Sequence, residues 1–258
     1  EVLDLGDKQE MAFTRRFSNN VENEVLLRVG EPVGIYYGYI EDQVLNSATE
    51  IANSPQADVL ENAVGAHKLY DVNGDGVIST MDMVPLARTA PKYTGGLGND
   101  LKYKNWDFSI FMRWVVGNDL INGNVTYMDN VGNGNWNTLK SMGDYRFSPA
   151  NPNGTFHGRG AGSYRDLMRS MYVEDGSFLK CDYITLGYKL PKSVLNKMNI
   201  RNLRLFARVG NPFMFTRYSG WDPEVSTGSG TVAKVGPGAD VGTYPRSVTY
   251  TLGLTLGL

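Results

Sequence analysis

The residues best suited to carry chemistry lie in one short acidic loop, residues 71–82. The loop follows D-x-[DN]-x-[DN]-G with an acid at the twelfth position, which is the pattern of calcium-binding loops. Gly76 allows the sharp turn that such a loop makes around an ion. The expected ligands are side-chain oxygens at positions 1, 3, 5 and 12 and the backbone carbonyl at position 7, from Asp71, Asn73, Asp75, Asp82 and Val77. The sequence therefore predicts a Ca2+ site that orders an exposed loop.

The same residues also fit a loop without metal. Asp82 is shorter than the glutamate usual at position 12, and Pro85 would end any following helix early. Asn and Asp side chains also accept hydrogen bonds from the backbone two residues on, which stabilises a turn with no ion. Both interpretations stay open at the level of sequence.

No other group of residues forms a recognisable catalytic site. Cys181 is the sole cysteine, and His67 and His157 are the two histidines, neither within a metal or catalytic motif. The glycine-rich stretch 95–98 precedes no helix, which excludes a phosphate-binding loop. A formal net charge of −2 argues against nucleic-acid binding. We therefore expect a protein that is not an enzyme.

Alternating apolar and polar residues dominate the second half of the chain. The last twelve residues place Val248, Leu252 and Leu256 on a face that carries no charge, opposite threonines and glycines. An alternation with period two predicts β-strands with one apolar face. The strands expected from this pattern are residues 93–103, 105–117, 178–190, 201–214 and 246–258.

An apolar strand face can point into lipid or into the core of a soluble sandwich. Trp106 and Trp114 lie on the same face, with a rise of about 20 Å between them if the strand is tilted by about 40°. The apolar band of a membrane barrel is about 25 Å tall and is edged by aromatic side chains. This spacing favours a strand that crosses a membrane.

The connections between these strands are unequal in length. Residues 103–106 form a tight turn, and 191–202 form a short link with a helical turn. Residues 43–92, 117–177 and 219–244 are long, polar and rich in Asn, Gly or Ser. Short turns on one side and long loops on the other are typical of outer-membrane barrels. Aromatic residues of these loops could stack on sugar rings or pack the loops themselves: Trp136, Tyr145, Phe147 and Trp221.

The expected fold is all-β and comprises the C-terminal strands of a large antiparallel transmembrane β-barrel with long extracellular loops. Residues 1–92 would form an extracellular region with a local hairpin near Ile35–Tyr39, and residues 93–258 would supply the barrel strands and outer loops. Five strands cannot close a membrane barrel, since the smallest need about eight. The remaining strands and a plug domain are expected from sequence outside this chain.

Several segments, in order along nearly the whole chain, resemble the SusC/RagA family of TonB-dependent transporters from Bacteroidota. The matching segments are 29–39 (VGEPVGIYYGY), 71–76 (DVNGDG), 91–97 (PKYTGGL), 103–109 (YKNWDFS), 173–180 (VEDGSFLK), 184–188 (ITLGY), 210–213 (GNPF) and 218–224 (YSGWDPE). The resemblance implies a multi-pass barrel of about 22 strands that encloses a plug. It also implies energy from TonB through the plug region, and a SusD-like lipoprotein that covers the outer loops.

The resemblance implies import of an oligosaccharide or peptide across the outer membrane of a Gram-negative bacterium. The expected partners are the SusD-like lipoprotein, TonB, the remainder of the same barrel and outer-membrane lipid. The loops 43–92, 117–177 and 219–244 are the expected docking surface for the lipoprotein. One alternative is a soluble, calcium-stabilised β-sandwich that binds glycans at the cell surface, and another is a passive porin.

Overall fold

A computed structural model describes residues 2–13, 24–56, 63–125, 138–156, 158, 167–198, 200–225 and 236–257. His157 and Trp136 lie outside these residues. The chain divides into two compact units, each made of three stretches of sequence. Unit 1 comprises Glu1–Ala90, Asp119–Asp175 and Glu224–Thr243, and unit 2 comprises Pro91–Asn118, Gly176–Pro223 and Tyr244–Leu258.

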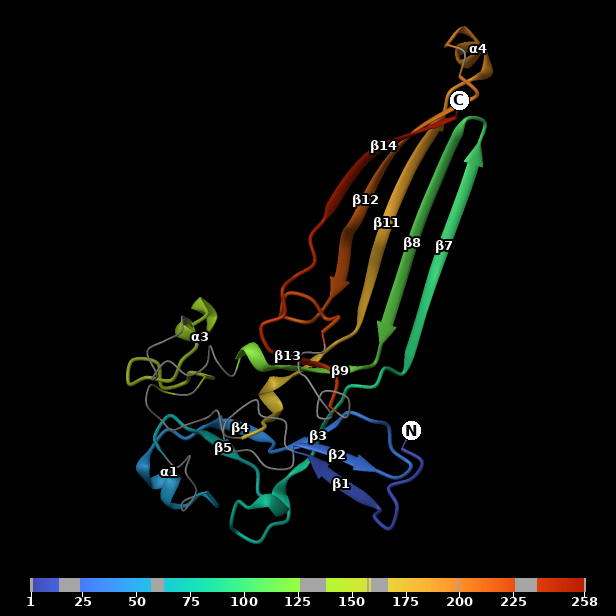
Figure 1. Ribbon diagram of the computed structural model, residues 1–258. Coiled ribbons are helices and arrows are strands. Elements are labelled where there is room, and N and C mark those ends of the chain that lie inside the picture. The colour runs from blue at the N-terminus through green and yellow to red at the C-terminus, as the bar shows by residue number, and fades with distance from the viewer. Residues whose placement is uncertain are drawn as a thin grey trace. The chain divides into compact units, whose positions relative to one another are not determined.

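Unit 2 is built on a sheet of five long antiparallel strands, which Figure 1 shows side by side. The strands are β7 (Tyr93–Tyr103), β8 (Trp106–Val116), β11 (Phe178–Lys189), β12 (Asn202–Thr216) and β14 (Thr249–Gly257). Their order in the sheet, β14-β12-β11-β8-β7, follows their order in the chain. Such a meander is the topology of up-and-down barrels.

Short connections fix the register of these strands. Lys104 adopts a positive φ of 53° in the two-residue turn between β7 and β8, so that Tyr103 pairs with Trp106. Between β11 and β12 the chain forms α4 (Lys192–Leu195), with Pro191 at its N-cap, and the 3-10 turn η4 (Asn196–Met198). The helical turn expected after Pro191 is therefore present.

The five strands predicted from alternation are all present. Each begins and ends within three residues of its expected bounds, for example 246–258 against Thr249–Gly257 for β14. One irregularity was not predicted. The pairing of β11 with both neighbours shifts between Cys181 and Tyr183, where Asn211 on β12 has a φ of 52°. A bulge of this kind bends a strand and turns a side chain to a new direction.

Unit 1 contains short strands in three small sheets. Its strands are β1 (Glu10–Phe13), β2 (Val25–Arg28), β3 (Ile35–Gly38), β4 (Glu41–Val44), β5 (His67–Leu69), β6 (Val84–Arg88), β9 (Asp119–Asn122), β10 (Val173–Asp175) and β13 (Ala239–Asp240). Its helical turns are α1 (Ala48–Ala52), η1 (Thr80–Asp82), α3 (Lys140–Asp144) and η3 (Ser170–Tyr172). The sheet orders are β1-β2-β3-β6, β10-β9-β13 and β4-β5.

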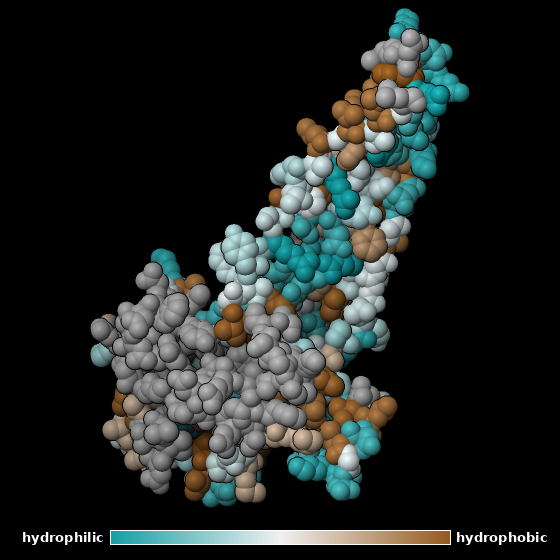
Figure 2. Space-filling view, viewed as in Figure 1, coloured by the Kyte–Doolittle hydropathy of each residue, from teal (hydrophilic) through white to brown (hydrophobic). Residues whose placement is uncertain are grey.

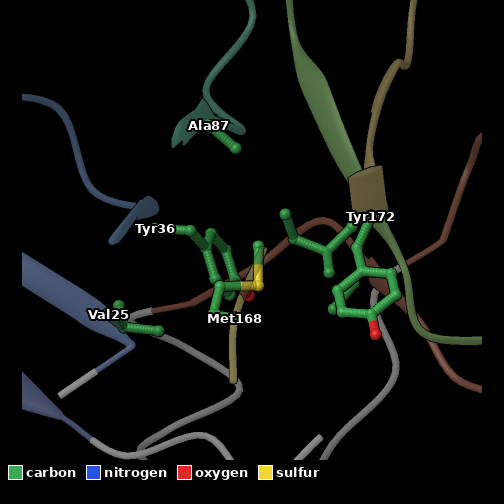
Figure 3. Close-up of a cluster of buried hydrophobic side chains, with 7 residues drawn as sticks. Val25, Tyr36, Ala87, Met168 and Tyr172 are labelled. Carbon is green, nitrogen blue, oxygen red and sulfur yellow. The ribbon is translucent and has the colours of Figure 1, made fainter. Parts of the chain in front are cut away.

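The core of unit 1 joins residues that are far apart in the sequence. Val25, Tyr36, Ala87, Met168 and Tyr172 belong to one buried cluster (Figure 3). Ile121 on β9 and Ala239 on β13 complete it. The Tyr36 hydroxyl donates to the carbonyl of Gly236 at 2.6 Å, which satisfies the polar group of a buried ring.

The expected loops are therefore more ordered than their composition suggests. Ile35–Gly38 forms the expected local hairpin with the preceding strand β2, and it also pairs with β6 on its other edge. Parts of residues 117–177 and 219–244 form the sheet β10-β9-β13 and contribute to the core. The assignment of residues 1–92 to the extracellular side and of 93–258 to the barrel stays a prediction. Within the described residues, no helix is both long and apolar enough to cross a membrane.

Candidate functional site

One face of the five-stranded sheet is apolar and open. Residues paired across neighbouring strands share a face, and the pairs place Leu101, Phe108, Leu186, Ala207 and Leu252 in one row. Leu252 is 86% exposed and Leu254 63% exposed. Residues of this face belong to none of the buried hydrophobic clusters found in the described chain.

A soluble sandwich would instead bury this face in a dry core. Leu252 and Leu254 do not converge on one, and Ile184 and Trp114 remain partly exposed. The sandwich interpretation is therefore wrong for the fold. An uncharged, open face on successive strands matches the lipid-facing side of a membrane barrel.

Aromatic residues edge the apolar face at both ends. Near the short turns, Tyr103, Trp106 and Tyr188 lie in one row, and the Trp106 and Tyr188 rings are 4.7 Å apart. Near the opposite end of the strands, Trp114 and Phe215 both flank Leu179. Aromatic side chains prefer the interface between lipid and water, so two such rows mark the two boundaries of an apolar band.

The other face of the sheet carries the charges, and we call it the polar face. Figure 2 shows a group of hydrophilic residues over these strands on the visible face. On this face the Arg204 Nε donates to Asp107 Oδ1 at 2.9 Å, across β11. The pair passes directly over Gly187, whose missing side chain leaves the room. Because polar residues of a membrane barrel line its interior, this face is the lumen wall.

A second ion pair lies at the bulge of β11. The Arg113 Nε donates to Asp182 at 2.7 Å, and both side chains are about one quarter exposed, at 30% and 24%. The bulge explains how Asp182 reaches the polar face, because the extra residue reverses the alternation locally. Lys180, also on this face, is 2% exposed. Two of the three arginines on the polar face are thus engaged with carboxylates.

The third arginine of the polar face, Arg208, has different surroundings. Its guanidinium carbon lies 4.2 Å from the centroid of the Tyr183 ring. Arg208 pairs along the ladder with Thr185 and Thr251. Its side chain is exposed, and a cation over an aromatic face stays available to an anion on its open side.

The predicted calcium residues lie in one loop of unit 1. The two oxygens of Asp71 accept from the backbone N–H groups of Gly74 and Gly76, at 2.7 and 2.8 Å. The Asn73 side-chain amide donates to Asp75 Oδ2 at 3.0 Å, and Asp75 Oδ1 accepts from the Val77 N–H. Asx turns therefore stabilise this loop, as expected if it folds without a metal ion.

Asp82 has a role that the calcium pattern did not predict. It is completely buried, and its Oδ1 accepts from the N–H groups of Val72 and Asn73, at 2.9 and 3.3 Å. Its Oδ2 accepts from the Ser79 N–H at 2.8 Å, which closes a capping box at η1. Burial opposes the charged form, but these backbone donors outweigh it and lower the pKa of Asp82 below its ordinary value.

The fit to calcium is partial. Asp71, Asn73 and Asp75 gather their oxygens in one turn, as positions 1, 3 and 5 require. The Asp82 oxygens accept from backbone N–H groups, as those of Asp71 do, and Asp82 is in addition completely buried. Among the residues described, no three His, Cys, Asp or Glu side chains are grouped to hold a metal. A calcium ion would thus be bound by side-chain oxygens of Asp71, Asn73 and Asp75 and by the Val77 carbonyl. Asp82 would join them only if one of its oxygens gave up a backbone hydrogen bond to bind the ion.

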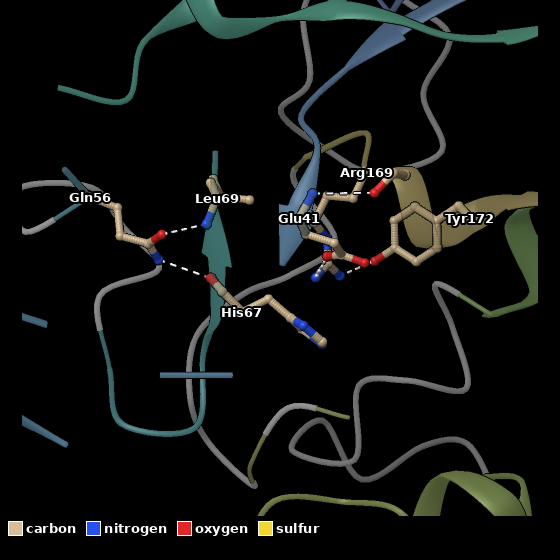
Figure 4. Close-up of polar contacts among 7 residues, drawn as sticks. Glu41, Gln56, His67, Leu69, Arg169 and Tyr172 are labelled. Carbon is tan, nitrogen blue, oxygen red and sulfur yellow. Dashed lines mark hydrogen bonds and ion pairs between the residues drawn. The ribbon is translucent and has the colours of Figure 1, made fainter. Parts of the chain in front are cut away.

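Unit 1 contains buried polar contacts that the sequence did not indicate (Figure 4). Arg169 is fully buried, and its Nη1 donates to Glu41 at 3.1 Å, while its other amino group donates to the Tyr172 hydroxyl. Gln56, also fully buried, accepts from the Leu69 N–H and donates to the His67 carbonyl. Glu41 and Arg169 are 128 residues apart, so no local pattern could connect them.

Comparison with known proteins identifies the family. The chain is 32% identical over 236 residues to TonB-dependent receptor P3 of Formosa agariphila, covering 90% of this chain and 23% of the receptor. It is 31% identical over 188 residues to TonB-dependent receptor SusC of Bacteroides thetaiotaomicron, covering 72% of this chain and 17% of SusC. The chain thus spans less than a quarter of the length of these relatives. No family model matches the sequence.

The fold agrees with solved structures of one transporter. The structure of the RagAB peptide transporter superposes with a TM-score of 0.72 and 19% identity, over 97% of this chain and 24% of that one. At this identity the likeness concerns the fold. Together with the curated relatives and the open apolar face, it shows that the chain belongs to the SusC/RagA family of TonB-dependent receptors and supplies C-terminal strands of the barrel.

Proposed function

We propose that the receptor containing this chain imports a nutrient, an oligosaccharide or a peptide, across the outer membrane of a Gram-negative bacterium. The observation that carries the proposal is the sheet of unit 2, with an open apolar face between two aromatic rows and a charged opposite face. The names of the relatives, TonB-dependent receptors and a peptide transporter, support energy-coupled uptake. This chain would form part of the lumen wall and of the outer loops, with no chemical change to the nutrient.

An uptake assay tests this proposal. A strain that lacks the full-length receptor is compared with its parent for accumulation of fluorescent oligosaccharides and peptides. We expect loss of uptake for at least one nutrient in the deletion strain, and the same loss in the parent after TonB is depleted. Uptake that persists without TonB would instead support the passive porin.

A SusD-like lipoprotein is the proposed partner at the outer loops. Several apolar residues in and beside the loop at residues 71–82 are exposed, which supports this proposal: Tyr70, Val72, Val77 and Met81. Apolar residues that gather on a surface commonly mark a protein interface. Residues 43–92 are therefore our preferred docking region within the three predicted loops.

Charge substitutions within that patch test the partner. Met81, 76% exposed, is changed to Asp in the full-length receptor, and Leu3, 81% exposed and remote in sequence, is changed to Asp as the control. We expect Met81→Asp to reduce co-purification of the SusD-like lipoprotein and Leu3→Asp to leave it unchanged. Equal recovery with both variants would contradict docking at this patch.

Calcium binding by residues 71–82 is a separate proposal. It is supported by the spacing and by the gathered oxygens of Asp71, Asn73 and Asp75. Asp71→Asn retains an acceptor oxygen for the Asx turn but loses the charge that an ion needs. We expect added calcium to slow proteolysis near residue 75 in the wild type and to have no effect in Asp71→Asn. Equal proteolysis with calcium or chelator in the wild type would leave the Asx turn as the sufficient explanation.

A further inference from the structure

The three arginines of the polar face differ in their partners. Arg204 is bound to Asp107 and Arg113 to Asp182, each by hydrogen bonds at or below 2.9 Å. In the described part of the chain Arg208 contacts the Tyr183 ring and is paired with no carboxylate. The nearest acid along its row, Asp100 on β7, is hydrogen-bonded to Ser109. One guanidinium on this wall therefore keeps its hydrogen-bonding edge open.

The residues that pair directly with Arg208 carry hydroxyl groups. Thr185 and Thr251 are its partners on the two neighbouring strands, and Thr249 lies one row along, paired with Gly210. Gly187, Phe206 and Gly253 form the adjacent row on the other side. Arg208 thus lies between threonines of the two neighbouring strands, with its guanidinium head over the Tyr183 ring and with the Phe206 ring over Gly253 in the next row.

We propose that Arg208 is the centre of an anion-binding site on the lumen wall, and that its ligand is a carboxylate. A guanidinium offers donors in a planar fork that matches a carboxylate in a bidentate pair. The contact with the Tyr183 ring holds the guanidinium in one place, which reduces the rotamer freedom lost on binding. Thr185 and Thr251 can donate further hydrogen bonds to the same oxygens.

The carboxylate can come from two sources. It can belong to an imported acidic peptide or uronic-acid oligosaccharide, which rests on the proposed import function and narrows its substrate class. It can also belong to another part of the receptor that fills the barrel. Both sources share the chemistry at Arg208, and chemical modification of arginine separates them without any measurement of transport.

The experiment is labelling of the purified full-length receptor with phenylglyoxal, with the rate at each arginine followed by mass spectrometry. The probes are a glutamate pentapeptide and oligogalacturonate, and the controls are a glutamine pentapeptide and neutral oligogalactose. Arg204 and Arg113 are internal references, because their ion pairs protect them. A probe at about ten times its Kd should slow labelling of Arg208 about tenfold, since only the unoccupied fraction reacts.

Each outcome decides between the sources or against the site. Fast labelling of Arg208 that only the acidic probes slow identifies a soluble carboxylate as the ligand. Slow labelling without any probe, together with loss of heat resistance in Arg208→Glu but not in Arg208→Lys, identifies a carboxylate of the receptor. The proposal is overturned if Arg208 labels rapidly whatever probe is present, or if it is unreactive and Arg208→Glu is as stable as the wild type.

Discussion

Gly187 shows how a missing side chain positions the charges of the lumen wall. A Cβ at this position would lie 2.5 Å from both Arg204 Nη2 and Asp107 Oδ2. Gly187→Ala should therefore push the ion pair apart and cost about 1–3 kcal/mol, as overpacking does. Urea unfolding of the full-length receptor in detergent measures this cost.

Gly98 on β7 provides the control for that substitution. A Cβ there would meet only Phe111, at 3.4 Å, which is an ordinary contact. Gly98→Ala should therefore leave the unfolding midpoint near the wild-type value. Equal midpoints for the two alanine variants would show that the Asp107–Arg204 pair moves without cost.

Asp82 gives a prediction about acid. The backbone donors hold the pKa of Asp82 below its ordinary value. The stability that the charged carboxylate contributes is therefore complete above the ordinary pKa and is lost as the pH falls through the lowered pKa of the folded loop. We expect protection of the Val72 and Ser79 amides from hydrogen exchange to decline in that acidic range, in calcium-free buffer. Asp82→Asn should show weaker protection at neutral pH with no further decline in acid. Protection at neutral pH that is as strong in Asp82→Asn as in the wild type would contradict a role for the carboxylate charge.

Single residues were predicted better than their partners. The alternation predicted strands with one apolar face, and the structure places Arg113, Arg204 and Arg208 on the opposite, polar face. Their bonds to Asp182 and Asp107 depend on register and on a bulge, which alternation in one strand does not reveal. Asp82 was predicted as a metal ligand, whereas its burial and backbone donors come from the way the loop folds back on η1.

At the scale of the element, β14 offers a direct comparison between its two faces. Leu252 lies on the lipid side, and its neighbour Thr251 lies on the lumen side. An arginine on the lipid face near the middle of a membrane costs about 2–4 kcal/mol, but a charge inside the lumen does not. Leu252→Arg should therefore lower the yield of folded receptor in the outer membrane, and Thr251→Arg should not.

The amount of heat-resistant receptor on a semi-native gel checks this pair. Because the two positions are adjacent, both variants should share any effect on synthesis or secretion. A difference in their folded yield therefore shows which face of β14 borders lipid. Similar losses for both arginine variants would mean that β14 does not border lipid.

The long strands could be predicted because their alternation continues for nine residues or more, as the lipid boundary requires. The strands of unit 1 have two to five residues, and β2 is buried or partly buried at every position. So short a segment has no measurable period, and its conformation depends on partners far along the chain. Composition alone therefore described these segments as loops.

At the scale of the whole molecule, substitution of Arg169 tests how much the buried Arg169–Glu41 pair contributes to the stability of unit 1. Removing one partner of a buried pair costs about 3–5 kcal/mol because the other charge stays without compensation. Arg169→Met should thus destabilise unit 1 through Glu41, whose side chain is 7% exposed. Hydrogen exchange at β3 and β9 should accelerate, because both strands border the shared core.

Arg88 is the matched control within unit 1. It bonds Glu31 at 3.6 Å on the surface, with the two side chains 58% and 30% exposed. Such a pair contributes about 0–1 kcal/mol, so Arg88→Met should barely change exchange at the same strands. If both methionine variants were equally mild, the buried pair would not hold unit 1 together.

The composition of unit 1 also constrains how the protein is made. Its core takes Val25 and Tyr36 from one stretch of chain, Ile121 and Met168 from a second and Ala239 from a third. Between these stretches run the hairpins β7–β8 and β11–β12. Contacts so distant in sequence form late, since long segments must first be brought together. We therefore expect the core of unit 1 to be completed only after the chain segments that separate its three stretches have been brought together.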